Sequence, residues 1–97
     1  MTVILNGAEL TSRRALHDFL QQALSLPDYY GRNLDALYDC LTDLREPVAL
    51  RVTVPDKLAD NLGFYANSLL LVLRRSAQEN ELLTVTVEEP EPTDPVL

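Results

Sequence analysis

Residues 48–54 read Val-Ala-Leu-Arg-Val-Thr-Val. Apolar side chains alternate with smaller or polar ones along this segment, which is the period of a strand with one buried face. Pro55 then opens a short helical turn over about residues 55–61, and Gly63 breaks it. The segment therefore predicts a strand near the middle of the chain, followed directly by a helical segment.

Two helices are predicted ahead of this strand. Ser12 is a suitable N-cap for a helix over about residues 13–25, which Pro27 ends. Asn33 is a suitable N-cap for a second helix over about residues 34–44. On the first helix, the spacing predicts an apolar face made of Leu16, Phe19, Leu20, Ala23 and Leu24.

Three further elements complete the pattern. Residues 2–5 are β-branched or apolar and precede the turn pair Asn6-Gly7, which predicts a first strand. Residues 65–79 predict a long helix and residues 82–87 a third strand. The side chains of the long helix expected to point inward are Leu69, Val72 and Leu73.

The predicted order of elements is therefore β-α-α-β-α-α-β. Helical segments between all the strands require crossovers, which indicates a parallel sheet with right-handed connections. We expect an α/β fold in which a small three-stranded parallel sheet, of strand order 2-1-3, is packed with helices. Residues 1–88 would form one domain, and residues 89–97, with three prolines among acids, a frayed tail.

The composition restricts the partners. Fifteen acidic residues against eight Lys and Arg give a formal charge of −7, which disfavours nucleic acid and favours a basic partner or only aids solubility. Cys40 is the single cysteine, so no internal disulfide is possible, which suits a reducing compartment. No signal peptide is apparent, and the longest apolar run, residues 69–73, is too short to span a bilayer. We expect a cytoplasmic protein without a membrane partner.

The second predicted helix carries an acidic face. Asp35, Asp39 and Asp43 are spaced by four and Thr42 lies beside them, opposite Leu34, Leu37, Leu41 and Leu44. A solvated polar face is the plain interpretation. However, aspartate is a poor helix former, like charges four residues apart repel, and Asp43 opposes the helix dipole. An acidic row carried at a local cost indicates a surface for a partner.

Tyrosines surround this helix. Tyr38 lies at the border of the acidic face, and the preceding loop adds Tyr29 and Tyr30. Tyrosine provides a large contact area at a low entropy cost, although one of the two loop tyrosines is expected to cover the core instead. Gly31 is expected to take a positive φ that turns the loop into the helix.

Residues 26–41 read Leu-Pro-Asp-Tyr-Tyr-Gly-Arg-Asn-Leu-Asp-Ala-Leu-Tyr-Asp-Cys-Leu and closely resemble the binding loop and helix of the barstar family. This resemblance implies a three-stranded parallel sheet with helices packed on it. It also implies a cytoplasmic inhibitor that protects its producer from a secreted ribonuclease by plugging the active site of the enzyme. The implied partner is a basic ribonuclease or a nuclease toxin, bound as a 1:1 heterodimer.

The resemblance also assigns roles to residues. Asp39 would be the main anchor for the cations that normally hold an RNA phosphate, and Asp35 a second acid. Tyr29 would pack near the catalytic histidine of the enzyme. The whole expected partner-binding set is Tyr29, Tyr30, Gly31, Asn33, Asp35, Tyr38, Asp39, Thr42, Asp43 and Glu79.

The sequence departs from the family pattern at the rim of this surface. Arg75 stands where the family places an acid on the last long helix, and Arg74 precedes it. Glu79, one turn later, would keep a weaker acid, and Leu44 replaces an aromatic residue. Rim charges tune rate and specificity, so these departures concern the identity of the partner more than the mode of binding.

Catalysis finds little support. His17 is predicted near the polar face of its helix and therefore at the surface, and Cys40 is predicted to be a buried, inert thiol. The chain has no Gly-rich phosphate loop, nucleophile elbow or zinc-ligand spacing, and the aspartates do not converge as a cation cage. We expect no enzyme activity, cofactor or metal. The alternatives are an immunity protein against a toxin that is not a ribonuclease, and a general acidic interaction module.

Overall fold

The computed structural model describes residues 1–88 of the 97-residue chain. Its elements are, in order, β1 (Thr2–Asn6), α1 (Arg13–Ala23), α2 (Leu34–Thr42), β2 (Val48–Thr53), α3 (Pro55–Leu62), α4 (Phe64–Glu79) and β3 (Leu83–Val87). The predicted order β-α-α-β-α-α-β is therefore confirmed. The tail predicted at residues 89–97 lies outside the described residues.

Local capping explains where the first two helices begin. Ser12 has an extended backbone, and its hydroxyl accepts a hydrogen bond from the amide of Ala15 at 3.0 Å. Asn33 does the same for α2, because its side-chain oxygen accepts from the amide of Ala36 at 2.7 Å. Both helices end slightly earlier than predicted, and the short helical turn expected after β2 is a full helix, α3.

The sheet has the order β1-β2-β3 with both pairings parallel, so the predicted order 2-1-3 is wrong. The register aligns Val3 with Leu50 and Leu50 with Val85. In the predicted order, right-handed crossovers would run in opposite directions and place the two helix pairs on opposite faces. In the observed order both crossovers run in the same direction, so a small chain needs to bury only one face of its sheet.

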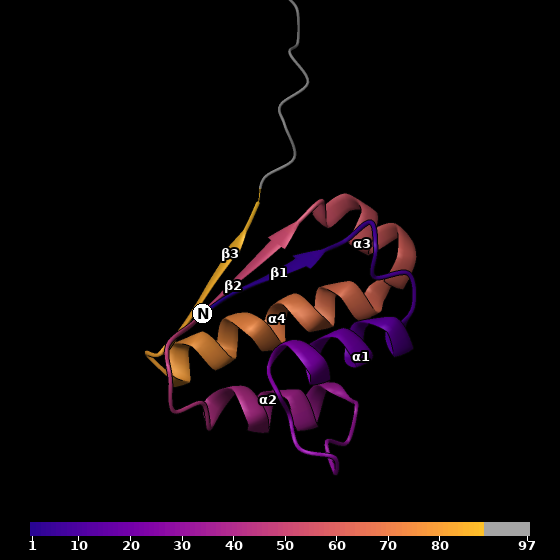
Figure 1. Ribbon diagram of the computed structural model, residues 1–97. Coiled ribbons are helices and arrows are strands. Elements are labelled where there is room, and N and C mark those ends of the chain that lie inside the picture. Colours follow the sequence, from indigo (N-terminus) through magenta and orange to yellow (C-terminus); the bar gives the residue numbers. More distant parts are fainter. Residues whose placement is uncertain (89–97) are drawn as a thin grey trace, which may run out of the picture.

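The two faces of the sheet differ accordingly. Leu5, Leu50 and Val52 are inaccessible to solvent on the inner face, whereas Ile4 and Arg51 on the outer face are exposed. Figure 1 shows α1, α2 and α4 on the same side of the sheet, with α4 between the sheet and α2. α2, with its acidic face, therefore lies in the outermost helical layer.

The residues that form the buried face of α1 differ in part from the predicted ones. Leu16 and Leu20 are inaccessible as expected, but Phe19 is 36% exposed. His17, which was predicted at the surface, is only 2% exposed, so that prediction is wrong. The imidazole tolerates burial because both of its nitrogens have hydrogen-bond partners.

The long helix α4 forms the middle layer. Leu69 and Leu73 are inaccessible as predicted, Val72 is half-buried, and Ala66 and Ser76 extend the buried row. This row faces both the sheet and α2, which makes α4 the support for the outer helix. No helix within residues 1–88 has both the length and the apolar composition needed to cross a membrane.

Candidate functional site

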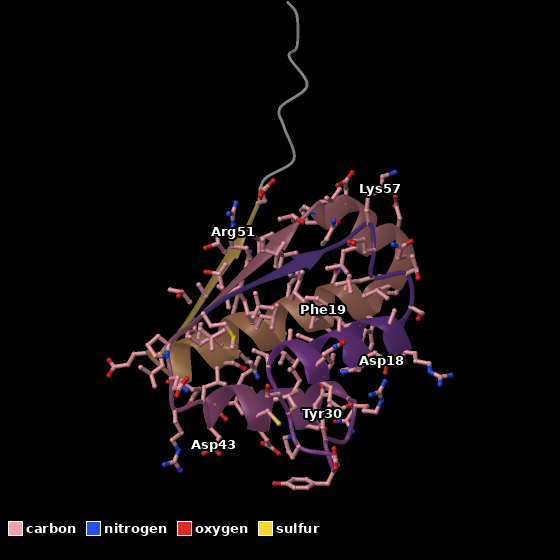
Figure 2. The ribbon with its side chains drawn as sticks, in the orientation of Figure 1. Asp18, Phe19, Tyr30, Asp43, Arg51 and Lys57 are labelled. Atoms are coloured by element: carbon pink, nitrogen blue, oxygen red, sulfur yellow. The ribbon has the colours of Figure 1, made fainter. Side chains whose placement is uncertain are left out.

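The exposed face of α2 carries the predicted acids. Asp35, Asp39 and Asp43 are all exposed, whereas Leu37 and Leu41 on the opposite face are inaccessible and pack into the core. The helix is therefore held by its apolar side and presents its carboxylates outward on successive turns. Figure 2 labels Asp43 at the C-terminal end of α2 and Tyr30 in the loop ahead of it.

Of the three carboxylates of this face, only that of Asp43 has an ion-pair partner within residues 1–88. Asp43 lies 3.9 Å from the guanidinium of Arg45, and both side chains are largely exposed, so this pair contributes little. Asp35 and Asp39 have no ion pair or side-chain hydrogen bond with any described residue. Their hydrogen-bonding capacity thus remains free for another molecule.

Thr42 and Tyr38 complete the helix face differently. The hydroxyl of Thr42 donates within the helix, to the carbonyl oxygens of Tyr38 at 2.8 Å and Asp39 at 3.2 Å. Both side chains are half-buried. They therefore border the acidic face and do not project from it.

The loop ahead of α2 joins this face through Tyr29, whose side chain is 88% exposed. Two adjoining hollows, of about 180 Å³ and 330 Å³, are both bordered by Pro27, Tyr29, Asp39 and Cys40. The exposed tyrosine and the central aspartate thus share one surface. The loop is fixed to α1, because the carbonyl oxygen of Pro27 accepts from the Gln21 side chain at 3.1 Å.

The turn into α2 is built around Gly31, but not as predicted. Arg32, with φ of 57°, takes the left-handed conformation instead of Gly31, so the prediction of a positive φ at the glycine is wrong. A Cβ at Gly31 would lie 3.1 Å from the Cβ of Ala36 and 3.2 Å from the side-chain nitrogen of Asn33, which is tighter than ordinary contact. Asn33 also donates to the Gly31 carbonyl at 3.2 Å. A side chain at this position would therefore require Ala36 or Asn33 to shift by a few tenths of an ångström.

Tyr30 covers the core, as expected for one of the two loop tyrosines. It is 5% exposed, and its hydroxyl lies 2.6 Å from Nδ1 of His17, while the hydroxyl of Tyr65 lies 2.7 Å from Nε2. A neutral imidazole donates from one nitrogen and accepts at the other, so both nitrogens are satisfied. Tyr30 therefore offers almost no area to a partner in the free chain and instead ties the loop to α1 and α4.

Burial also sets the protonation of this cluster. Desolvation lowers the pKa of His17, the nearby Arg32 lowers it further, and Asp18 opposes them. Desolvation raises the pKa values of Tyr30 and Tyr65. The three side chains are thus neutral near pH 7 and form a structural hydrogen-bonded cluster.

Asn80 is a site residue that the sequence analysis missed. Its side-chain nitrogen donates to the carbonyl oxygens of Leu41 and Leu44, both at 3.1 Å, which lie at the C-terminal end of α2. The Leu41 carbonyl otherwise accepts only a long bond, 3.5 Å, from the Leu44 amide, so Asn80 supplements the cap of α2 from a distant segment. No local signal reveals this, because an asparagine after a helix is also an ordinary turn residue. Its neighbour Glu79, the last residue of α4, is exposed.

Chemical reactivity is weak at this surface. Cys40 is half-buried, and its thiol pKa is raised by desolvation, with further contributions from Asp39 and Asp43. A neutral thiol is a poor nucleophile and a poor metal ligand. Among residues 1–88, no group of histidine, cysteine and acidic side chains is arranged to hold a metal ion.

Comparison with known proteins agrees with this geometry. The family described as Barstar (barnase inhibitor) matches residues 1–88. The chain is also 40% identical over 78 residues to the Bacillus subtilis (strain 168) protein named "Putative ribonuclease inhibitor YrdF", covering 79% of this chain and 86% of the relative. Proteins of this family are inhibitors and not enzymes, as the sequence predicted for this chain. The chain belongs to the barstar family.

Proposed function

We propose that this protein inhibits a cationic ribonuclease by covering its active site with the acidic face of α2 and the loop over residues 28–32. The observation that carries the proposal is that the exposed carboxylates of Asp35 and Asp39 have no partner within residues 1–88, and that Asp39 borders the same hollow as the exposed ring of Tyr29. The family and the printed name of the Bacillus subtilis relative support the same role.

The chemistry follows from what a ribonuclease must bind. Its substrate is a polyanion, so its active site is concave and lined by cations. Carboxylates on a rigid helix can occupy the positions of phosphates there and accept paired hydrogen bonds from guanidinium groups. Asp39, at the centre of the face, would be the main anchor, and Asp35, one turn earlier, the second acid.

The scaffold limits the entropy lost on binding. Asn33 caps one end of α2 and Asn80 the other, so the carboxylates are held in place before the partner arrives. Tyr29 adds a large aromatic contact, and Tyr30 supports the loop from beneath. The rim would consist of Gly31, Asn33, Tyr38, Thr42, Asp43 and Glu79.

Long-range attraction would assist capture. The chain has a formal charge of −7, and a basic enzyme would be drawn to it from beyond contact distance. Such steering weakens as salt shortens the Debye length. The inhibitor would act in the cytoplasm of the producing cell, as a 1:1 complex with the enzyme.

Titration of ribonuclease activity tests the proposal, with barnase, the enzyme in the family description, as the first probe. Wild type should abolish RNA cleavage at one equivalent. Asp39→Ala should weaken inhibition by about 2 kcal/mol or more, roughly thirtyfold, because it removes the central anchor. Asp60→Ala on α3 removes another exposed carboxylate, away from α2, and should leave inhibition unchanged.

Two outcomes would contradict the proposal. Equal inhibition by Asp39→Ala and wild type would exclude the α2 face as the inhibitory surface. Binding to a basic protein without loss of RNA cleavage would indicate a general acidic interaction module, and protection against a toxin that is not a ribonuclease would indicate a different immunity protein.

A further inference from the structure

A hollow of about 560 Å³ on α1 and the adjoining loop is lined by Arg13, Arg14, His17, Asp18 and Arg32. Three of the eight Lys and Arg residues of an otherwise acidic chain meet there. We propose that this arginine pocket receives a carboxylate of the ribonuclease, so that the interface combines an acidic helix with a cationic pocket. This inference rests on the proposed function and adds a second contact region to the surface that would bind the ribonuclease.

The cations of the pocket are not used up within residues 1–88. Arg14 is exposed, and its side chain has no ion pair or hydrogen bond with any described residue. The guanidinium of Arg13 lies 4.2 Å from the centre of the Tyr65 ring and has no carboxylate partner in the same range. Only Arg32 is neutralised, by its ion pair with Asp18. The described pocket therefore retains a net positive charge.

The positions of Arg13 and Arg14 are electrostatically unfavourable for the helix itself. Arg13 and Arg14 lie in the first turn of α1, which contains no acidic residue. The helix dipole makes this end positive, so anionic side chains are favoured there and cationic ones are unfavourable. An anion bound in the pocket would meet both the arginines and the positive end of the helix.

The pocket adjoins the loop of the proposed interface through Arg32. Arg32 lies directly between Gly31 and Asn33 in the loop that leads into α2. Its guanidinium donates to the Gln21 side chain at 2.8 Å and to the Arg14 carbonyl at 3.4 Å, which fixes the loop against α1. A protein that covers Tyr29 and Asp39 would therefore reach the pocket across a single loop.

The charge of the whole molecule favours a carboxylate on a protein partner over a nucleic acid. A polyanion would have to approach a chain of formal charge −7 that also places Asp18 in the pocket wall. A single carboxylate on a basic enzyme escapes this repulsion, because the enzyme is attracted as a whole. The two nitrogens of His17 are already bonded to tyrosine hydroxyls, so the arginines alone would hold the group.

A charge-reversal variant distinguishes general electrostatic attraction from binding of a carboxylate in the pocket, because the two predict opposite effects on inhibition. Arg14→Glu makes the chain more negative by two charges, so general attraction to a cationic enzyme predicts equal or faster association. Occupation of the pocket by a carboxylate predicts the reverse, with inhibition about tenfold weaker. Lys57→Glu makes the same charge change in the first turn of α3, away from both surfaces, and is the matched control. Figure 2 shows Lys57 on α3, beyond the ends of the strands.

The measurement is the inhibition constant and association rate of the three proteins against the ribonuclease that wild type inhibits, with barnase as the first probe. Glutamate is favoured in the first turn of a helix, so Arg14→Glu should unfold no earlier than wild type, and weaker inhibition would not reflect misfolding.

The expected result is weaker inhibition by Arg14→Glu alone. If Arg14→Glu inhibits as well as Lys57→Glu while Asp39→Ala inhibits more weakly than wild type, the pocket proposal is overturned and the proposed function stands. If wild type inhibits no cationic ribonuclease, the proposed function and the pocket proposal both fail.

Discussion

The adjacent residues Tyr29 and Tyr30 belong to two regions that treat polar groups in opposite ways. Tyr29 is 88% exposed beside Asp39, whose carboxylate has no partner in the described chain, whereas Tyr30 is 5% exposed in a cluster where His17 has both nitrogens bonded. No buried side-chain polar atom within residues 1–88 lacks a partner. The core thus satisfies its polar groups internally, and the α2 face leaves the carboxylates of Asp35 and Asp39 without a partner in the same residues, which is the difference expected between a structural cluster and a binding surface.

The largest difference in stability is expected between the two single variants in which one of these tyrosines is replaced by alanine. Tyr30→Ala removes a buried aromatic side chain and should lower the free energy of unfolding by about 3–5 kcal/mol. Tyr29→Ala should change it by less than about 0.5 kcal/mol, because the ring is exposed, yet it should weaken ribonuclease inhibition. Urea unfolding and inhibition titrations of both variants provide the measurement. Equal destabilisation by the two substitutions would refute the division of roles.

Protonation of His17 should disturb the same cluster more gently. Because desolvation lowers the pKa of His17 in the folded state, the unfolded chain binds more protons below its ordinary value of about 6.5. The free energy of unfolding should therefore be constant above that pH and fall as the pH drops below it, by about 1.4 kcal/mol for each unit of difference between the two pKa values.

Unfolding measured between pH 8 and pH 5.5 checks this before most carboxylates titrate. His17→Phe removes the titrating group and should abolish the pH dependence in this window, although the variant itself is less stable because it leaves two tyrosine hydroxyls without a partner. Stability that rises as the pH falls would show that the folded state prefers the imidazolium.

A smaller effect is expected where α4 holds the end of α2. Asn80→Ala removes the side-chain donor to the carbonyls of Leu41 and Leu44 and should cost about 1 kcal/mol of stability. Amide hydrogen exchange near the end of α2 should accelerate, and inhibition should weaken less than in Asp39→Ala. Asn67→Ala, at an exposed position on α4, is the control and should leave both measurements unchanged.

The sequence predicted those features that depend on near neighbours. The caps at Ser12 and Asn33 and the apolar and acidic faces of α2 follow from a few adjacent residues. The three parallel strands follow from the alternation of helices and strands. Such local signals are repeated along each element, so single exceptions do not hide them.

Features that join distant segments were not predictable in the same way. The burial of His17 depends on hydroxyls from Tyr30 and Tyr65, which lie 13 and 48 residues away. The strand order depends on which face the crossovers cover, and the role of Asn80 on carbonyls 36 to 39 residues earlier. The glycine at position 31 correctly indicated a turn, but the residue with the left-handed backbone is Arg32, whose side chain is hydrogen-bonded to α1.

The smallest effect should show the local cost of the acidic row itself. Asp39 lies four residues from both Asp35 and Asp43, so Asp39→Asn relieves two like-charge repulsions with little change in shape or helix propensity. The free energy of unfolding should rise by about 0.5 kcal/mol at low salt, while inhibition is strongly weakened. In about 1 M salt, where the Debye length falls to about 3 Å, the gain should disappear. A variant that is less stable than wild type would mean that Asp39 has a partner inside its own chain, and the carboxylate would then not be free for an enzyme. A more stable variant that inhibits more weakly is the expected outcome, because a surface selected for binding keeps charges that folding alone would remove.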